Sequence, residues 1–188
     1  MIKNIISLLI FALAVISILY FLPIDDITYP NDEIELKEDA PLPNELHPVV
    51  DGKKEELISK SAEKGIDIII TDGFRSVEEQ NRLYERGRST GGNIVTNVKG
   101  GGSYHNYGLA IDFALRLDDG NVIWDLEHDG NDNGESDWME VVAIAKDLGF
   151  EWGGDWPGFK DYPHLQMDFG LRVGELKRGY RPTEEAHE

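Results

Sequence analysis

The sequence predicts an α+β fold in a single domain that follows an apolar N-terminal segment. One observation favours this class, and two more limit the function that it can carry. Short apolar runs bounded by turn residues alternate with stretches of helical spacing, and a length of 188 residues suits one domain with appendages. The chain has no cysteine, which excludes disulfides and thiolate metal ligands. The net charge of -18 argues against binding nucleic acid through a basic surface.

The first stretch, residues 5–22, is an almost unbroken apolar run that is long enough to cross a bilayer. Lys3 precedes the run, and Asp25 and Asp26 follow it, which predicts that the N-terminus lies inside and the remaining chain outside. A cleaved signal peptide is the alternative, although the bulky residues 18–22 lack the small residues of a cleavage site. We therefore expect a single-pass membrane protein whose domain lies outside the cell, or a secreted protein in the alternative case.

Residues 25–46 carry eight acidic residues, three prolines and one lysine. Such a composition cannot bury a core and is typical of an extended linker. The sequence therefore predicts four regions: a membrane anchor or signal sequence at 1–24, this linker at 25–46, a folded domain at 47–175 and a polar tail at 176–188.

The elements of the domain follow from local patterns. Apolar residues at helical spacing predict a helix over 54–64, and Gly65 ends it. Ser76, with Glu79 three residues later, matches a capping box that begins a second helix. A third helix is expected at 138–148, and strands are expected at 66–71, 109–115, 121–124 and 164–169.

Two short motifs supply two imidazoles and two carboxylates. Residues 103–112 contain His105, expected on a loop after three glycines, and Asp112, in the middle of a buried strand. A buried carboxylate is costly unless it is paired or binds a metal ion. The second motif contains Asp161 and His164. Two histidines and one aspartate can hold a zinc ion with a position open for water, and the remaining aspartate is then free to act as a base.

The pattern S-x-H-x-x-G-x-A-x-D, followed by D-x-x-H, resembles the LAS group of zinc peptidases, which joins lysostaphin, the D-Ala-D-Ala metallopeptidases and the Hedgehog N-terminal domain. The likeness runs from about Leu57 to Phe169 and is greatest to VanY-type and phage-endolysin peptidases. It implies one zinc ion per chain and Asp161 as the catalytic acid and base. The zinc ligands implied by the resemblance are His105, Asp112 and His164.

A further segment, residues 72–76 together with Gln80, is also similar to this group. The resemblance implies that Arg75 stabilises the oxyanion, and that Gln80 and Ser103 bind substrate. A guanidinium at the end of a strand can offer two donors to a developing negative charge. From the residues alone, a surface arginine at the start of a helix is the alternative.

The resemblance implies hydrolysis of the stem peptide of bacterial peptidoglycan, so the expected location is the bacterial cell membrane, with the catalytic domain facing the cell wall, or secretion in the alternative case. Asp161 favours an L-alanyl-D-glutamate endopeptidase, because the carboxypeptidase branch typically has glutamate at that position. We expect one antiparallel sheet with helices packed on one side, as in the LAS and Hedgehog type of fold. A D-alanyl-D-alanine or L,D-carboxypeptidase is one alternative, and a zinc-containing wall-binding module without catalysis is another. Asp155 is a weaker candidate for the base.

Residues 129–140 match D-x-D/N-x-D/N-G-x5-E, the pattern of the EF-hand calcium loop. No helix is expected before the loop, and two neutral asparagines would weaken calcium binding. The alternative is a polar turn that caps the following helix. The oxygen ligands of a calcium ion would come from Asp129, Asn131, Asn133 and Glu140.

Overall fold

The computed structural model describes residues 34–36, 40–86, 88–89 and 95–183. They all belong to one compact unit that spans residues 33–188. The apolar run at residues 5–22 and most of the acidic linker lie outside the described residues. The division into four regions therefore stays a prediction.

The prediction of a location in the bacterial cell membrane is wrong, because the following structural finding contradicts it. No helix in the described part of the chain has both the length and the apolar character that a bilayer crossing requires. The longest one, α2 (Pro48–Glu63), has 16 residues, and several of them are charged. A helix needs about 20 apolar residues to span the hydrocarbon layer.

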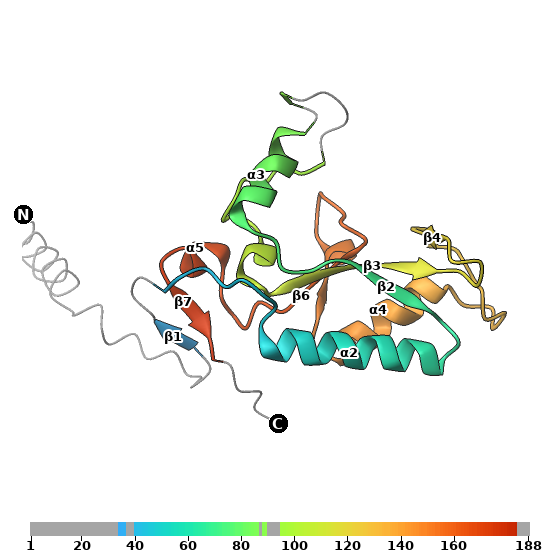
Figure 1. Cartoon of the computed structure of the whole chain (residues 1–188). Coiled ribbons are helices and arrows are strands. Elements are labelled where there is room, and N and C mark those ends of the chain that lie inside the picture. Colours follow the sequence, from blue (N-terminus) through green and yellow to red (C-terminus); the bar gives the residue numbers. More distant parts are fainter. Residues whose placement is uncertain (1–33, 37–39, 87, 90–94, 184–188) are drawn as a thin grey trace, which may run out of the picture. The chain divides into compact units, whose positions relative to one another are not determined.

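An antiparallel sheet lies at the centre of the unit, as predicted (Figure 1). Its strands follow the order β2-β3-β6-β5, and β4 pairs with the far end of β3. Cross-strand pairing places Asp112 opposite His164, and Glu151 opposite Gln166. The strands are β2 (Ile68–Asp72), β3 (Ala110–Arg116), β4 (Val122–Ile123), β5 (Glu151–Trp152) and β6 (His164–Gln166).

Each of the three longer helices begins with a recognisable local signal. In α2 this signal is Pro48, whose fixed φ suits the first turn, and the helix therefore starts six residues earlier than predicted. The predicted capping box of Ser76 and Glu79 is confirmed and opens α3 (Val77–Glu85). Ser136 caps α4 (Asp137–Asp147). A fourth helix, α5 (Val173–Leu176), follows the sheet in the chain.

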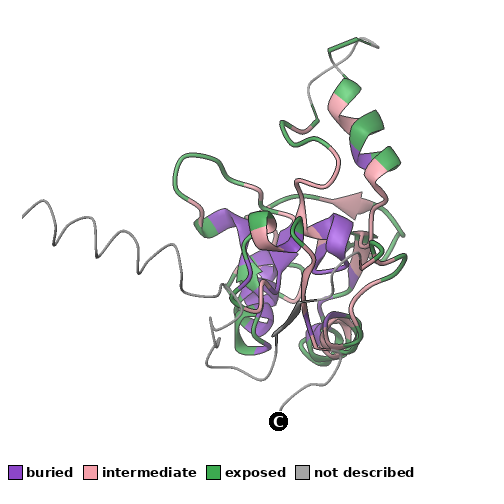
Figure 2. Ribbon diagram, turned by 90° about the vertical axis from the view of Figure 1, so that its left-hand side faces the viewer, coloured by how far each residue is buried: buried purple, intermediate pink, exposed green. Residues whose placement is uncertain are grey.

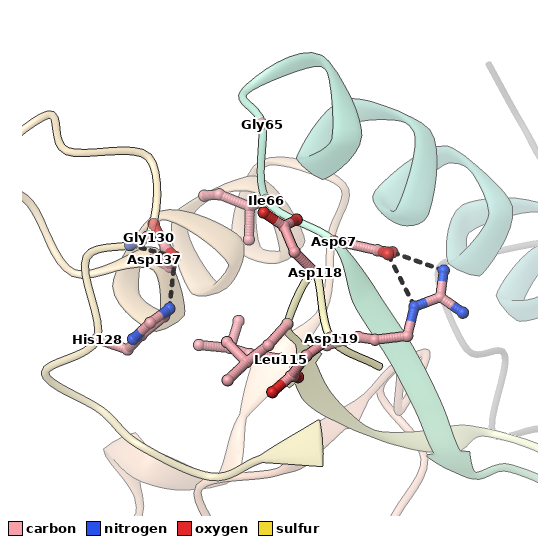
Figure 3. Close-up of a pocket in the computed structure, with 11 residues that line it drawn as sticks. Gly65, Ile66, Asp67, Leu115, Asp118, Asp119, His128, Gly130 and Asp137 are labelled. Atoms are coloured by element: carbon pink, nitrogen blue, oxygen red, sulfur yellow. Dashed lines mark hydrogen bonds and ion pairs between the residues drawn. The ribbon is translucent and has the colours of Figure 1, made fainter. Parts of the chain in front are cut away.

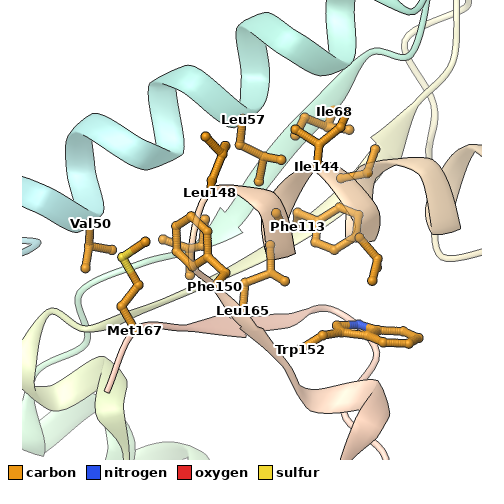
Figure 4. Packing of buried hydrophobic residues seen from close by; sticks show 14 of the residues in the cluster. Val50, Leu57, Ile68, Phe113, Ile144, Leu148, Phe150, Trp152, Leu165 and Met167 are labelled. Carbon is orange, nitrogen blue, oxygen red and sulfur yellow. The ribbon is translucent and has the colours of Figure 1, made fainter. Parts of the chain in front are cut away.

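The hydrophobic core lies between one face of the sheet and the helices α2 and α4 (Figure 4). Alternation along β3 sends Ile111 and Phe113 into this core, where Phe113 packs on Trp138 with ring centroids 4.4 Å apart. The helix α3 carries mostly exposed and half-buried residues (Figure 2), and its one buried residue is Gln80. The other face of the sheet carries polar side chains, Asp112 among them.

Three shorter elements complete the unit. A two-stranded antiparallel sheet joins β1 (Ile34–Leu36) to β7 (Tyr180–Pro182). The 3₁₀ helix η3 (Gly153–Asp155) follows β5. His105 lies in a second 3₁₀ helix, η2 (Tyr104–Tyr107), and not on an open loop, because Ser103 caps this turn and Gly108 ends it with a φ of 69°.

Candidate metal and active site

Three side chains meet on the polar face of the sheet: His105 from η2, Asp112 from β3 and His164 from β6. Nε2 of His105 lies 3.2 Å from Nδ1 of His164. Each of these nitrogens lies 3.3 Å from Oδ1 of Asp112. Ligands at zinc-bond lengths around a tetrahedral ion are about 3.3–3.4 Å apart, so the three atoms have the spacing of a zinc site.

Hydrogen bonds on the outer side of the two imidazoles direct their lone pairs inwards. Nδ1 of His105 lies 2.7 Å from the carbonyl oxygen of Gly73, which can only accept, so Nδ1 carries the proton. By the same argument Nε2 of His164 donates to Oε1 of Gln166 at 3.0 Å. Both inner nitrogens are then acceptors. They face the buried Oδ1 of Asp112, which accepts no hydrogen bond.

Three converging acceptors repel one another unless a cation lies between them. Burial raises the pKa of Asp112, but the two imidazoles outweigh burial when they are protonated and donate to the carboxylate, and they then hold the pKa of this carboxyl well below its usual range. Burial lowers the pKa of His164, but the bonds to Asp112 and Gln166 and the charges of Asp112 and Asp161 together raise it by more. A proton or a metal ion can thus relieve the repulsion, and the donor set of two imidazoles and one carboxylate fits zinc.

Asp161 is held beside this group by its backbone. Its N–H donates to the carbonyl of Gly153 at 3.2 Å, and its own carbonyl accepts from the N–H of His164 at 3.2 Å. A Cβ on Gly153 would lie 2.4 Å from the carbonyl oxygen of Asp161, so this approach requires glycine. Burial, and then the charge of Asp112, raises the pKa of Asp161, which suits a proton acceptor. Asp155 is exposed and pairs with Lys146 at 2.6 Å.

Arg75 neutralises two carboxylates that face each other across β2 and β3. Asp72 is the register partner of Asp112, and like charges in such positions repel. The guanidinium donates to Asp72 from Nε at 3.1 Å and from Nη2 at 2.5 Å, and Nη2 lies 3.7 Å from Asp112 Oδ2. Nη1 donates to Oε1 of Gln80 at 2.8 Å. The structure thus brings Arg75 to the metal-type group.

Two residues expected to bind substrate are occupied with internal contacts. Gln80 is buried, accepts from Arg75 and donates to the carbonyl of Val98 at 2.8 Å. The hydroxyl of Ser103 accepts from the N–H of His105 at 3.4 Å and caps η2. Both side chains therefore hold the elements that carry Arg75 and His105.

The sequence interpretation missed four residues around the site. Asp72 had a usable signal, because it stands three residues before Arg75 at the end of a strand. Gln166 shares one face of β6 with His164, as alternation along a strand requires, but nothing in the sequence marked its contact with the imidazole. Nothing local marked Asn106, whose amide donates to the carbonyl of Arg75 at 2.8 Å. Trp156, whose ring centroid lies 5.1 Å from that of His164, had a weak signal in its place within a glycine- and tryptophan-rich segment before Asp161.

The predicted calcium loop is not supported, because its acceptors are matched by donors of the chain itself. Glu140 accepts from Nζ of Lys64 at 2.8 Å through one oxygen, and from the amide groups of Asn131 and Asn133 through the other. The two asparagines thus point nitrogen atoms at the carboxylate. Both oxygens of Asp129 accept backbone N–H groups of the loop. The polar turn that caps α4 is the interpretation that fits.

A separate hollow of about 360 Å³ lies beside the turn after β3 (Figure 3). Two of its carboxylates, those of Asp67 and Asp137, have partners in the chain. Asp137 accepts from the N–H of Gly130 at 2.9 Å, and Asp67 pairs with Arg116 at 2.7 Å. His128 Nε2 is 3.9 Å from Asp137, so no convergent set of ligands forms there. Of the described residues, His105, Asp112 and His164 are the group with metal-ligand geometry.

Comparison with known proteins gives consistent matches. A family model described as D-alanyl-D-alanine carboxypeptidase matches residues 96–167. The peptidoglycan L-alanyl-D-glutamate endopeptidase CwlK of Bacillus subtilis (strain 168) is 63% identical over 130 residues, which cover 69% of this chain and 78% of that protein. The L-alanyl-D-glutamate peptidase of Listeria phage A118 is 36% identical over 118 residues, which cover 60% of this chain and 34% of the phage protein.

Among solved structures, the L-Ala D-Glu endopeptidase ChiX of Serratia marcescens has a TM-score of 0.45 and 22% identity, and the match covers 66% of this chain and 81% of that chain. The family assignment depends on the sequence relatives and not on this likeness. The identity to the Bacillus subtilis relative and the coverage of that protein are high enough to assign the family. The chain belongs to the LAS-type peptidoglycan peptidases that its motifs resemble, which include D-alanyl-D-alanine carboxypeptidases and L-alanyl-D-glutamate endopeptidases.

Proposed function

We propose that the chain is a zinc endopeptidase that hydrolyses the bond between L-alanine and D-glutamate in peptidoglycan stem peptides. The observation that carries this proposal is the convergence of three acceptor atoms, 3.2–3.3 Å apart, beside the partly buried Asp161. The similarity to an enzyme named for this bond supports the choice of substrate.

In this proposal His105, Asp112 and His164 hold the zinc ion. When bound there, zinc would polarise a carbonyl group and would lower the pKa of water, so that a hydroxide nucleophile is available at neutral pH. Asp161 accepts the proton of the attacking water, because its raised pKa favours the protonated form. The same carboxyl then donates the proton to the nitrogen of the leaving D-glutamyl residue, so the base is regenerated when the amine departs.

Arg75 is proposed to stabilise the oxyanion. Three of the five guanidinium N–H groups donate to Asp72 and Gln80, which leaves two for substrate. Rigid support matters because a donor that is already oriented needs no reorganisation during the reaction. The role of Gln80 is therefore to position Arg75, and Ser103 acts through the short helix that carries His105.

A carboxypeptidase is the second candidate, and the description of the matching family model favours it. Such an enzyme needs a cation for the terminal carboxylate of its substrate. Arg75 is the cation beside the proposed ligands, but Asp72 already pairs with it at 2.5 Å. This pairing leaves little net positive charge for a free carboxylate, which favours an internal bond as the substrate.

The test is mass spectrometry of products from purified muropeptides incubated with the full chain and zinc. If the chain is an endopeptidase, we expect two products, a muramyl-L-alanine fragment and a free peptide that begins with D-glutamate. Release of D-alanine alone would establish the carboxypeptidase. A chain that binds zinc stoichiometrically and cleaves neither bond would contradict both, and would favour the wall-binding module.

A further inference from the structure

Four polar side chains form a continuous row across the face of the sheet that is opposite the core. His164 and Gln166 are two residues apart on β6 and therefore share one face. Strand pairing sets Asp112 opposite His164, and Glu151 opposite Gln166. His164 and Gln166 are each only 5% exposed, whereas Glu151 lies exposed on the adjoining strand. The row thus connects the solvent to one of the proposed metal ligands.

Hydrogen bonds along this row have only one consistent direction. A carboxylate has no proton to donate, so Oε2 of Glu151 must face the amide nitrogen of Gln166, which lies 3.0 Å away. The amide oxygen of Gln166 then faces Nε2 of His164 at 3.0 Å. An amide can in general be turned either way in a structure. Here the carboxylate fixes the choice, because the opposite orientation would place two oxygens against each other.

The direction of these bonds determines the tautomer of the imidazole. The amide oxygen of Gln166 can only accept, so the proton of neutral His164 resides on Nε2. Nδ1 then keeps its lone pair, and this is the atom that faces His105 and Asp112. If the proton moved to Nδ1, it would occupy the place where a metal ion has to bind.

The second imidazole is controlled in a different way. His105 donates to the backbone carbonyl of Gly73, so its tautomer is set by the fold and by no side chain. The orientation of His164 depends on two side chains, and one of them is exposed. A substitution at Gln166 or Glu151 can therefore change the tautomer and the orientation of His164 while His164 itself stays in the chain.

We propose that Gln166 and Glu151 are positioning residues: Gln166 holds His164 in the Nε2–H tautomer, and Glu151 holds the amide of Gln166 in the orientation that this requires. The inference rests on the proposed metal site, since it explains how one ligand of that site is prepared. Loss of a hydrogen-bond partner behind a metal ligand typically costs about 10–100-fold in metal affinity.

The first measurement is zinc affinity of the full chain by competition with a chelator. Gln166→Leu should raise the Kd by about 10–100-fold. Glu151→Ala should raise it by a smaller factor, since the amide of Gln166 can still bond but is free to turn. The exposed Glu63 on α2 gives a matched control, and Glu63→Ala should leave the Kd unchanged.

A double exchange separates this role from simple packing. In Glu151→Gln with Gln166→Glu, the carboxylate at 166 still accepts from Nε2 of His164, and the amide at 151 donates back to that carboxylate. Both hydrogen bonds survive, so zinc affinity should return towards that of the parent. If melting curves show that the double variant is folded and it still binds zinc no more tightly than Glu151→Ala does, the positioning role is overturned.

The second measurement needs no metal. Nitrogen NMR of the metal-free protein, at a pH high enough for the imidazole to be neutral, reports which ring nitrogen carries the proton. The parent should show His164 protonated on Nε2, and Gln166→Leu should shift it towards Nδ1. An unchanged tautomer in Gln166→Leu would overturn the inference. If the parent itself fails to bind zinc, the proposed function loses its metal site, while this measurement still decides the role of Gln166.

Discussion

Two regions of the molecule carry metal-binding patterns in their sequence, and the structure treats them in opposite ways. At His105, Asp112 and His164, three acceptor atoms converge. The N–H groups of the two imidazoles point away from this meeting point, and the inner oxygen of Asp112 accepts no hydrogen bond. In the loop of residues 129–140, the acceptors are satisfied from within. Lys64 places its ammonium group on Glu140 at 2.8 Å, where the loop motif would require a calcium ion.

The difference teaches that ligand residues at the correct spacing are necessary but not sufficient for a metal site. Acceptors that the fold leaves facing one another need a cation, because their mutual repulsion is otherwise uncompensated. Acceptors that already receive N–H groups and an ammonium group gain little from a metal ion. The predictions below test this contrast, from the largest expected effect to the smallest.

Removal of any one ligand should abolish tight zinc binding. For His105→Ala, Asp112→Ala or His164→Ala we expect the Kd for zinc to rise by more than about 100-fold, the upper end of the effect of losing an outer partner. Metal analysis after dialysis against a chelator measures this. Asp129→Ala in the other region is the control and should keep full zinc. Stoichiometric zinc in all three ligand variants would contradict the site.

Asp161→Asn should separate catalysis from metal binding. The amide keeps the shape of the side chain but cannot accept a proton, so kcat should fall by about 10²–10⁴-fold. Zinc content and melting temperature should match those of the parent. Activity close to that of the parent would move the role of base to Asp155, and Asp155→Asn is therefore the matched control.

Arg75→Ala should lower kcat by about 10²–10³-fold, which is typical of the loss of one oxyanion donor. Zinc affinity should change much less, because Arg75 is 3.7 Å from Asp112 and is not a ligand. Steady-state kinetics on a muropeptide substrate gives the comparison. A rise in KM with unchanged kcat would instead assign Arg75 to ground-state binding.

Lys64→Met should remove the internal cation of the loop. The ammonium group of Lys64 lowers the pKa of Glu140 more than partial burial raises it, so the folded value lies below the unfolded value of 4.5. The resulting stabilisation is present above pH 4.5 and is lost as the pH falls through the folded value. Because Lys64 is half exposed and screened, the parent should melt no more than about 4 °C above the variant.

Melting curves measured at about pH 6 and about pH 3 test this prediction, since the gap should be smaller at the lower pH. Lys60→Met, one helical turn earlier on α2, is the control. A gap of unchanged size at the lower pH would show that Lys64 acts by packing and not by charge.

Calcium should have the smallest effect. At millimolar calcium the melting temperature of the parent should stay within about 1 °C of its value without calcium. A ligand stabilises a folded protein only to the extent that it binds the folded state. A clear rise that Glu140→Ala removes would restore the calcium site and overturn the contrast drawn above. Magnesium at the same concentration controls for ionic strength.

Much of the site was predictable from the sequence because its residues lie in two short motifs. The spacing within residues 103–112 places His105 just before the strand that carries Asp112, and both this strand and the capping box at Ser76 are confirmed. Such features depend on local backbone chemistry, which neighbours in the sequence determine. The start of α2 and the short helix around His105 were missed, because a proline at a first turn and a single 3₁₀ turn leave weak periodic signals.

Tertiary structure alone decided which acceptors would meet donors. Lys64 and Glu140 are 76 positions apart in the chain, and Gly73 and His105 are 32 apart. Sequence patterns contain the identity of ligands but not the partners that folding brings from a distance. The sequence by itself therefore determined the LAS-type motifs and the residues able to bind zinc, whereas only the packed sheet and helices could leave one set of acceptors facing each other and satisfy the other with a lysine.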